Sequence, residues 1–143
     1  MIRKVLIPID GSEHAIRAVE YAVGLAKEIS SLAVHLVIVH ITPSALEEVH
    51  AYKMEQRAAQ LAPQHSEKLL KPALAKLAAA KVPVTTEVRT GPTAQQICRA
   101  ATDHGCDTII MCTRGMGAIA NLLMGSVATK VVHLSTVPVL LVK

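Results

Sequence analysis

Two glycine clusters in the carboxyl-terminal part of the chain form the pattern best suited to chemistry. They lie in the segment TRGMGAIANLLMGSVAT, residues 113–129, directly after an apolar run, residues 108–112, that is typical of a buried strand. An apolar stripe at helical spacing begins after Ser126, the expected N-cap of a helix. Because glycine lets the backbone approach a ligand and a helix amino terminus attracts anions, this arrangement predicts a phosphate site.

The charges around this helix start also favour an anion. The first turn after Ser126 contains no Asp or Glu, and neither does any part of the chain from Thr108 onward, whereas Arg114 lies nearby. At the other clear helix starts, we expect acidic or capping side chains to compensate the unpaired amides of the first turn. These are a glutamate after Ser12 and a capping box that begins at Thr93. The Ser126 helix is therefore expected to be the one that lacks compensation.

Strands alternate with helices along the chain, and this order predicts the fold. We expect a single domain over residues 1–143, of the α/β class, with a doubly wound, Rossmann-like sheet of five parallel strands and helices on both faces. In such sheets ligands bind beyond the carboxyl ends of strands, where Asp10, Ile41 and Thr113 are expected. The expected strands are residues 5–9, 34–41, 82–88, 108–112 and 137–142, and the expected helices follow Ser12, pass through Leu69 and Leu77, run from Thr93 to His104 and follow Ser126.

The segment between Pro43 and Lys81 allows two interpretations. It is rich in Ala, Glu, Gln and Lys, and we expect Pro63 and Pro72 to break its helical pattern. In one interpretation, Ser44 to Gln60 is an exposed segment that closes over a ligand as a lid. In the other, it is a surface connection that leads into an ordinary crossover helix.

Composition excludes several classes of protein. A hydrophobic content of 51% excludes a disordered chain, and an aromatic content of 1% with scattered Lys and Arg argues against nucleic acid as a partner. Apolar runs stop well short of the ~20 residues needed to span a bilayer, and the amino terminus turns polar too early for a signal peptide, so a cytoplasmic protein is expected. We expect free thiols at the three cysteines and no metal site, since the histidines show no ligand spacing.

Two common phosphate-binding patterns do not fit the glycine segment. A Walker A loop requires a Gly-Lys pair, and the chain contains none. Gly115, Gly117 and Ala120 match a variant of the dinucleotide fingerprint, but no acidic residue follows Asp107 to hold a ribose. The glycines therefore point neither to a P-loop ATPase nor to a dinucleotide-binding protein.

A third spacing does fit. Gly115 is followed after nine residues by Gly125 and Ser126, and the segments VLIPIDGSEHA, VIVHI, VRTGPTAQQI and VPVLLVK accompany it along essentially the whole chain. In these features the chain resembles the universal stress protein family, whose nucleotide-binding members carry Gly, two residues, Gly, nine residues, then Gly-Ser or Gly-Thr. Cys112 stands in place of the first glycine. Sequence alone leaves open whether that position needs a positive φ, at which cysteine would be strained.

The resemblance implies a site for an adenine nucleotide, ATP or else AMP or ADP, with or without Mg²⁺. In the family, the end of the first strand borders the nucleoside, the second strand meets the adenosine part through its backbone, and the glycine loop and helix start surround the ribose and phosphates. The implied site residues in this chain are Pro8, Ile9, Asp10, Ile41, Met111, Cys112, Thr113, Arg114, Gly115, Gly117, Gly125, Ser126 and Val127.

The function implied is that of an ATP-binding regulatory or stress-response protein, and two alternatives stay open. One is a nucleotide-free interaction module of the same fold with an unknown protein partner. The other is a slow Mg²⁺-dependent ATPase or phosphotransferase, although no convincing base accompanies Asp10 and Arg114. Asp10 has its own alternative role, which is to close the turn before the helix that follows Ser12. Because related proteins pair their last strands, we expect a homodimer through Val137 to Val142.

Overall fold

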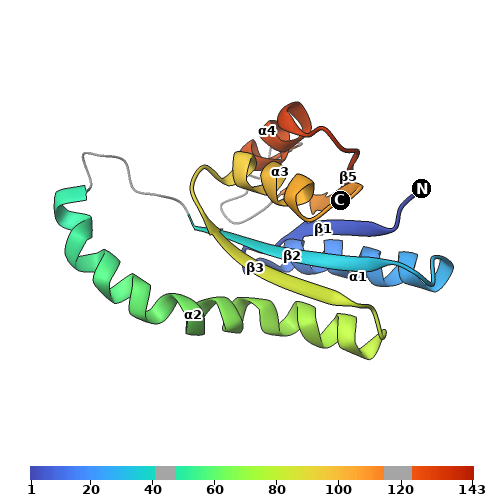
Figure 1. Ribbon diagram of the computed structural model, residues 1–143, viewed down its shortest axis with the longest axis horizontal. Coiled ribbons are helices and arrows are strands. Elements are labelled where there is room, and N and C mark those ends of the chain that lie inside the picture. The colour runs from blue at the N-terminus through green and yellow to red at the C-terminus, as the bar shows by residue number, and fades with distance from the viewer. Residues whose placement is uncertain (41–47, 115–123) are drawn as a thin grey trace.

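The computed structural model describes residues 1–40, 48–114 and 124–143, with the backbone alone over residues 48–63. It confirms the predicted α/β class, because five parallel strands form one sheet in the order β3-β2-β1-β4-β5 and helices cover the sheet (Figure 1). The elements are β1 (Lys4–Pro8), α1 (Glu13–Glu28), β2 (Ala33–His40), α2 (Glu48–Ala79), β3 (Val84–Thr90), α3 (Thr93–Asp103), β4 (Thr108–Cys112), α4 (Ser126–Leu134) and β5 (Val139–Val142).

The inner strands are apolar along almost their whole length, as expected for strands covered on both faces. All five residues of β4 are buried, and so are the three central residues of β1. Strand β2 lies between β1 and β3, so its predicted interior position is confirmed. Strand β3 is at the edge of the sheet and mixes exposed with partly buried residues.

Two apolar layers enclose the sheet. Helices α1 and α2 pack on one face, where Val19 and Leu77 are fully buried. Helices α3 and α4 pack on the other face, where Ile97 and Val131 are buried in the same way. Burial of an aliphatic side chain of this size contributes about 1.5–3 kcal/mol, so these layers hold the strand ends in fixed positions.

The order of the strands creates a switch point between β1 and β4. From β1 the chain moves outward to β2 and then β3, and after α3 it returns to the other side of β1 as β4. Strands β1 and β4 pair directly, with Val5 opposite Thr108 and Leu6 opposite Ile109. The connections that leave these two strands therefore diverge, and in doubly wound sheets the crevice at that place is where ligands bind.

Helix α2 corrects the expectation that proline would break this region. Its backbone is continuous over 32 residues, through both Pro63 and Pro72, and it is visibly curved (Figure 1). Leu70, Ala73 and Leu77 are buried at intervals of three and four residues, whereas Pro72 lies on the exposed side. The hydrogen bond that Pro72 cannot donate is thus lost on the solvent side, where water can replace it.

The proposed lid segment falls partly outside the structural description. Residues 44–47 lie outside the described residues. Residues 48–60 form the first part of α2, so the crossover helix begins earlier than either interpretation expected. Despite the length of α2, none of the helices in the described ranges is apolar enough over a sufficient length to cross a membrane.

Two strands begin later than the sequence predicted. Strand β3 begins at Val84 rather than at Val82, and β5 begins at Val139 rather than at Val137. In both places the amide of the residue predicted to begin the strand is already hydrogen-bonded within the preceding turn. Val82 N donates to Leu77 O at 3.0 Å, and Val137 N donates to the hydroxyl of Ser135 at 3.1 Å. An amide already bonded within a turn cannot extend the ladder of a sheet.

Candidate functional site

Several residues expected in the site lie at the carboxyl ends of β1 and β4. Pro8 closes β1 and is followed by Ile9 and Asp10, while Thr113 and Arg114 follow β4. Because the strands are parallel and adjacent, these two groups lie at the same edge of the sheet, at the switch point. Ile9 is buried and its amide donates to Val37 O of the neighbouring β2 at 2.8 Å, whereas Asp10 is exposed.

Asp10 closes the turn that leads from β1 into α1. Its Oδ1 accepts hydrogen bonds from the Ser12 amide at 2.9 Å and from the Ser12 hydroxyl at 2.5 Å. Ser12 in turn accepts from the Ala15 amide at 3.2 Å and is the N-cap of α1, the helix expected to follow it. The turn role that we weighed for Asp10 is therefore correct, and these bonds fix the carboxylate at the end of β1.

The start of α4 differs by one residue from the prediction. Gly125, not Ser126, is the N-cap, and no side chain caps the helix. The reason is that Gly125 keeps an extended backbone, with φ −69° and ψ 162°, so the helical conformation begins at Ser126. Thr129 donates to the Gly125 carbonyl through both its amide, at 3.0 Å, and its hydroxyl, at 2.9 Å.

Gly125 also anchors α4 to the end of β4. Its amide donates to Thr113 O at 2.5 Å, and a Cβ atom at this position would lie 3.3 Å from that same oxygen. Glycine therefore allows the helix start to approach the loop after β4 more closely than most side chains would. Behind this contact the exposed Ser126 and the partly buried Val127 begin the first turn of α4.

The expectation that this helix start alone lacks compensation is wrong. Helix α3 also has no acidic residue in its first turn, and its N-cap is Pro92 rather than Thr93, with no side-chain cap. Pro92 has an extended backbone, with φ −61° and ψ 121°, which moves the first helical residue to Thr93 and removes the predicted capping box. The two helix starts lie at different positions along the sheet. Helix α3 follows the edge strand β3, whereas α4 follows β4 at the switch point.

Cys112 lies in β4 with an unstrained backbone. Within the described part of the chain, Lys81 is the only residue other than glycine with a positive φ. The Cys112 side chain is buried on the face covered by α1, where its thiol donates to His14 O, while the neighbouring Met111 packs on the opposite face with α3 and α4. Burial raises the pKa of the Cys112 thiol, which favours an inert core residue over a reactive thiolate.

Three of the expected site residues cannot be placed. Ile41, Gly115 and Gly117 lie outside the described residues. Of the remaining positions, Thr113 and Arg114 are partly exposed in the loop after β4. The described part of the site therefore consists of the end of β1, the end of β4 and the start of α4.

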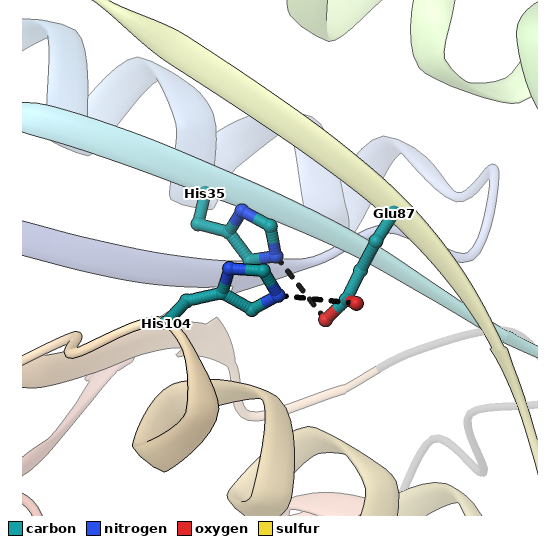
Figure 2. Close-up of side chains that lie close together, drawn as sticks. All are labelled: His35, Glu87 and His104. Carbon is teal, nitrogen blue, oxygen red and sulfur yellow. Dashed lines mark ion pairs between the residues drawn. The ribbon is translucent and has the colours of Figure 1, made fainter.

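A second group of polar side chains, not expected from the sequence, lies away from this edge of the sheet. His35 of β2, Glu87 of β3 and His104, which follows α3, point toward one another (Figure 2). The sequence interpretation missed this group because its members are separated by 52 and 17 positions and meet only through the pairing of β2 with β3. The available signal was His35, which lies between apolar residues within the second strand.

Comparison with known proteins extends these observations. The model of the universal stress protein family matches residues 1–143. The chain is 32% identical over 152 residues to the universal stress protein YxiE of Bacillus subtilis, with 100% of both chains covered. The structure of hypothetical protein MJ0577 has a TM-score of 0.86 and 26% identity and covers 100% of this chain and 96% of its own. A universal stress protein in complex with cAMP has a TM-score of 0.70 and 22% identity, with 99% and 96% covered.

Proposed function

Because this chain belongs to the universal stress protein family, we propose that it binds an adenine nucleotide, with ATP as the first candidate, and acts as a regulatory module. The proposed site lies at the carboxyl ends of β1 and β4, next to the start of α4. A universal stress protein of the same fold has been solved in complex with cAMP, which supports an adenine nucleotide as the ligand class.

The start of α4 is the observation that carries the proposal. An α-helix leaves its first amides without partners inside the helix, and here neither a capping side chain nor an acidic residue in the first turn compensates them. The Gly125 amide is used in the bond to Thr113 O, so the amides of Ser126 and Val127 are the donors we assign to phosphate. The bond to Thr113 O also brings these donors close to the end of β4 at the switch point, whereas α3 begins after the edge strand β3.

The remaining residues would border the other parts of the nucleotide. In our proposal the end of β1, from Pro8 to Asp10, lies beside the nucleoside, and Arg114 supplies positive charge near the phosphates. Ile41, Gly115 and Gly117 are kept as proposed contacts on the strength of the family resemblance alone. The Asp10 carboxylate is an oxygen ligand of the kind that Mg²⁺ accepts when the ion accompanies nucleotide phosphates.

Thermal unfolding with and without nucleotide tests the proposal. ATP at ~100 times its dissociation constant should stabilise the protein by about 2.7 kcal/mol. For a chain of this size the midpoint should rise by several degrees, at roughly 2–4 °C per kcal/mol. The same scan with AMP, ADP and ATP, each with Mg²⁺ or with a chelator, ranks the nucleotides. A midpoint unchanged by every adenine nucleotide would contradict the proposal and favour the nucleotide-free interaction module.

A matched pair of proline variants tests the role of the α4 amides. Proline is well accepted at the first position of a helix and removes only an amide that has no partner inside it. Both Ser126 and Thr93 hold that position, and the residue before each is extended, as proline requires. Ser126→Pro should weaken ATP binding about 10- to 150-fold, the value of a hydrogen bond to a charged group, whereas Thr93→Pro should leave it unchanged.

A third variant separates the amide from the side chain. Ser126→Ala keeps the amide and removes the hydroxyl, so it should bind ATP more tightly than Ser126→Pro. Equal affinities for Ser126→Pro and Thr93→Pro would place the phosphates elsewhere, even if ATP binds.

A further inference from the structure

We propose that His35, Glu87 and His104 form a zinc-binding site that ties the edge strand β3 to the end of α3. This site would be separate from the proposed nucleotide site. His35 is the third of the eight residues of β2, whereas the proposed nucleotide site lies at the carboxyl ends of the strands. The group lies on the face of the sheet that α3 covers (Figure 2).

The three side chains already bring suitable donor atoms together. One imidazole nitrogen from each histidine and a carboxylate oxygen lie within 4.8 Å of one another. His35 Nε2 is 3.2 Å from Glu87 Oε1, and His104 Nε2 is 3.1 Å from Glu87 Oε2 (Figure 2). Two imidazoles and one carboxylate are a ligand set that zinc accepts, with water in the fourth position.

His35 presents a nitrogen that lacks a hydrogen bond. Its side chain is 1% exposed, and although Nε2 is within ion-pair distance of Glu87, it makes no hydrogen bond to any residue in the described ranges. The other ring nitrogen, Nδ1, is 2.6 Å from the hydroxyl of Thr85. When Nδ1 carries the proton and donates it to Thr85, Nε2 keeps its lone pair and faces the carboxylate, as in many zinc sites. Burial also lowers the pKa of His35, which favours this neutral ring.

Neighbouring charged residues orient the Glu87 carboxylate but leave one of its oxygens available to a metal ion. Arg89 Nε donates to Glu87 Oε1 at 2.8 Å, and Arg89 Nη2 is 2.9 Å from Asp103 Oδ2. This leaves Oε2, the oxygen closer to His104, for a metal ion. Burial is the largest single influence on Glu87 and opposes its ionisation, but the neighbouring groups together, with the hydrogen bond from Arg89 foremost, outweigh burial and lower the pKa of the carboxyl group. Glu87 is therefore a charged ligand at neutral pH.

A small movement would complete the coordination. Zinc holds nitrogen at about 2.0–2.1 Å in a tetrahedral arrangement, which puts two ligating nitrogens roughly 3.3 Å apart, so each pair of donors must close by at most about 1.5 Å. The two rings are stacked, with centroids 3.8 Å apart and planes inclined by only 24°, so one ring must turn before both lone pairs, which lie in the ring planes, can point at one ion. His104 is 35% exposed and follows the last turn of α3, so it is the ring that can turn toward the ion.

The ligand set distinguishes zinc from magnesium. Imidazole nitrogen suits zinc and other late transition ions, whereas Mg²⁺ prefers six oxygen ligands and keeps most of its water. Mg²⁺ added with a nucleotide should therefore not compete at this site. The two proposed sites can be tested independently for that reason.

Competition with a chromophoric zinc chelator, in nucleotide-free protein, tests the inference. The wild-type chain should bind one Zn²⁺, and His104→Ala should weaken binding by at least about a hundredfold, since loss of an outer partner alone typically costs 10- to 100-fold. Thr85→Val, which removes such an outer partner, should fall in that lower range. Glu87→Gln repeats the ligand test with a side chain of the same shape.

Two controls make the result decisive. His133 is exposed on α4 outside the group, so His133→Ala should bind zinc like the wild type. Co²⁺ should give visible d–d absorption without a thiolate-to-metal band, because no cysteine belongs to the proposed ligand set. The inference is overturned if His104→Ala and Glu87→Gln both keep wild-type affinity, if the wild type binds no zinc, or if a thiolate band appears. Circular dichroism of each variant establishes that it is folded.

Discussion

The turn after β1 offers a prediction whose magnitude follows from the structure. Gly11 has φ +83°, a left-handed conformation, and a Cβ atom at this position would lie 2.5 Å from Leu69 Cδ2 of α2. Gly11→Ala should therefore strain the backbone and displace the Leu69 side chain. Because Gly11 follows Asp10, the same change would disturb the end of β1 at the proposed nucleotide site.

The expected cost combines three contributions. A left-handed conformation costs an alanine about 1–2 kcal/mol, and pushing Leu69 off its rotamer costs about 0.5–1.5 kcal/mol. Restriction of the unfolded chain by alanine offsets about 0.4–1 kcal/mol of this. The net loss of unfolding free energy should be about 0.5–3 kcal/mol, measured by urea denaturation, with a fall in melting temperature of about 1–12 °C.

Gly24 provides a matched control within the same protein. It lies inside α1, and a Cβ atom there would meet nothing within 4 Å, so Gly24→Ala should stabilise the protein by roughly 0.5–1 kcal/mol. The loss caused by Gly11→Ala should be smaller in a Leu69→Ala background, because the side-chain clash is then absent. A Gly11→Ala protein as stable as the wild type would refute this account of the turn.

Three further predictions concern the core, the sheet edge and the thiols. Ile110→Ala should lower the unfolding free energy by about 2–5 kcal/mol, since Ile110 is fully buried; a loss below about 1 kcal/mol would contradict its place in the core. We propose a homodimer through the open side of β5. Val142 O accepts from Thr113 N and so faces β4. Since successive residues of a strand direct their backbone groups to opposite sides, the Leu141 amide faces the open side. Leu141→Pro should convert a dimer to a monomer in sedimentation experiments, and an unchanged mass would exclude this edge. Burial raises the pKa of all three cysteines, so native protein should react slowly with thiol reagents at neutral pH. Because the native state holds these protons more tightly than the unfolded state, the free energy of unfolding should fall as pH rises above about 8.5. Fast labelling of all three thiols at pH 7 would contradict the burial of Cys106 and Cys112 and the partial burial of Cys98.

Much of the fold was predictable because it depends on local pattern. The apolar runs of β1, β2 and β4 were found within about one residue, since strands covered on both faces carry few polar residues. The five-stranded parallel sheet followed from the alternation of strands and helices, and so did the places of Asp10 and Thr113 after the carboxyl ends of β1 and β4, which are adjacent.

The errors occurred where the backbone is set by its surroundings. Ser126 and Thr93 are both favourable N-cap residues, yet the extended Gly125 and Pro92 take that position, and Gly125 does so in contact with Thr113 O. Pro72 is tolerated within α2 because it lies opposite the buried face. Local propensity was overridden by packing in each of these places.

The group of His35, Glu87 and His104 lay beyond sequence reasoning for a different reason. Its geometry depends on the register of two strands, in which Val37 rather than His35 is opposite Glu87, and on where α3 ends. Neither the strand register nor the end of α3 can be read from local residue spacing, so no sequence motif predicts the group.

In the function proposed for this protein, the first amides of α4 hold the phosphates of an adenine nucleotide. Titration of ¹⁵N-labelled protein with ATP, followed by amide NMR, tests it most directly. The largest shifts should come from the amides of Ser126 and Val127, whereas Thr93 at the start of α3 should stay unchanged. Saturating ATP that leaves Ser126 and Val127 unmoved, or that shifts Thr93 more strongly, would contradict the account.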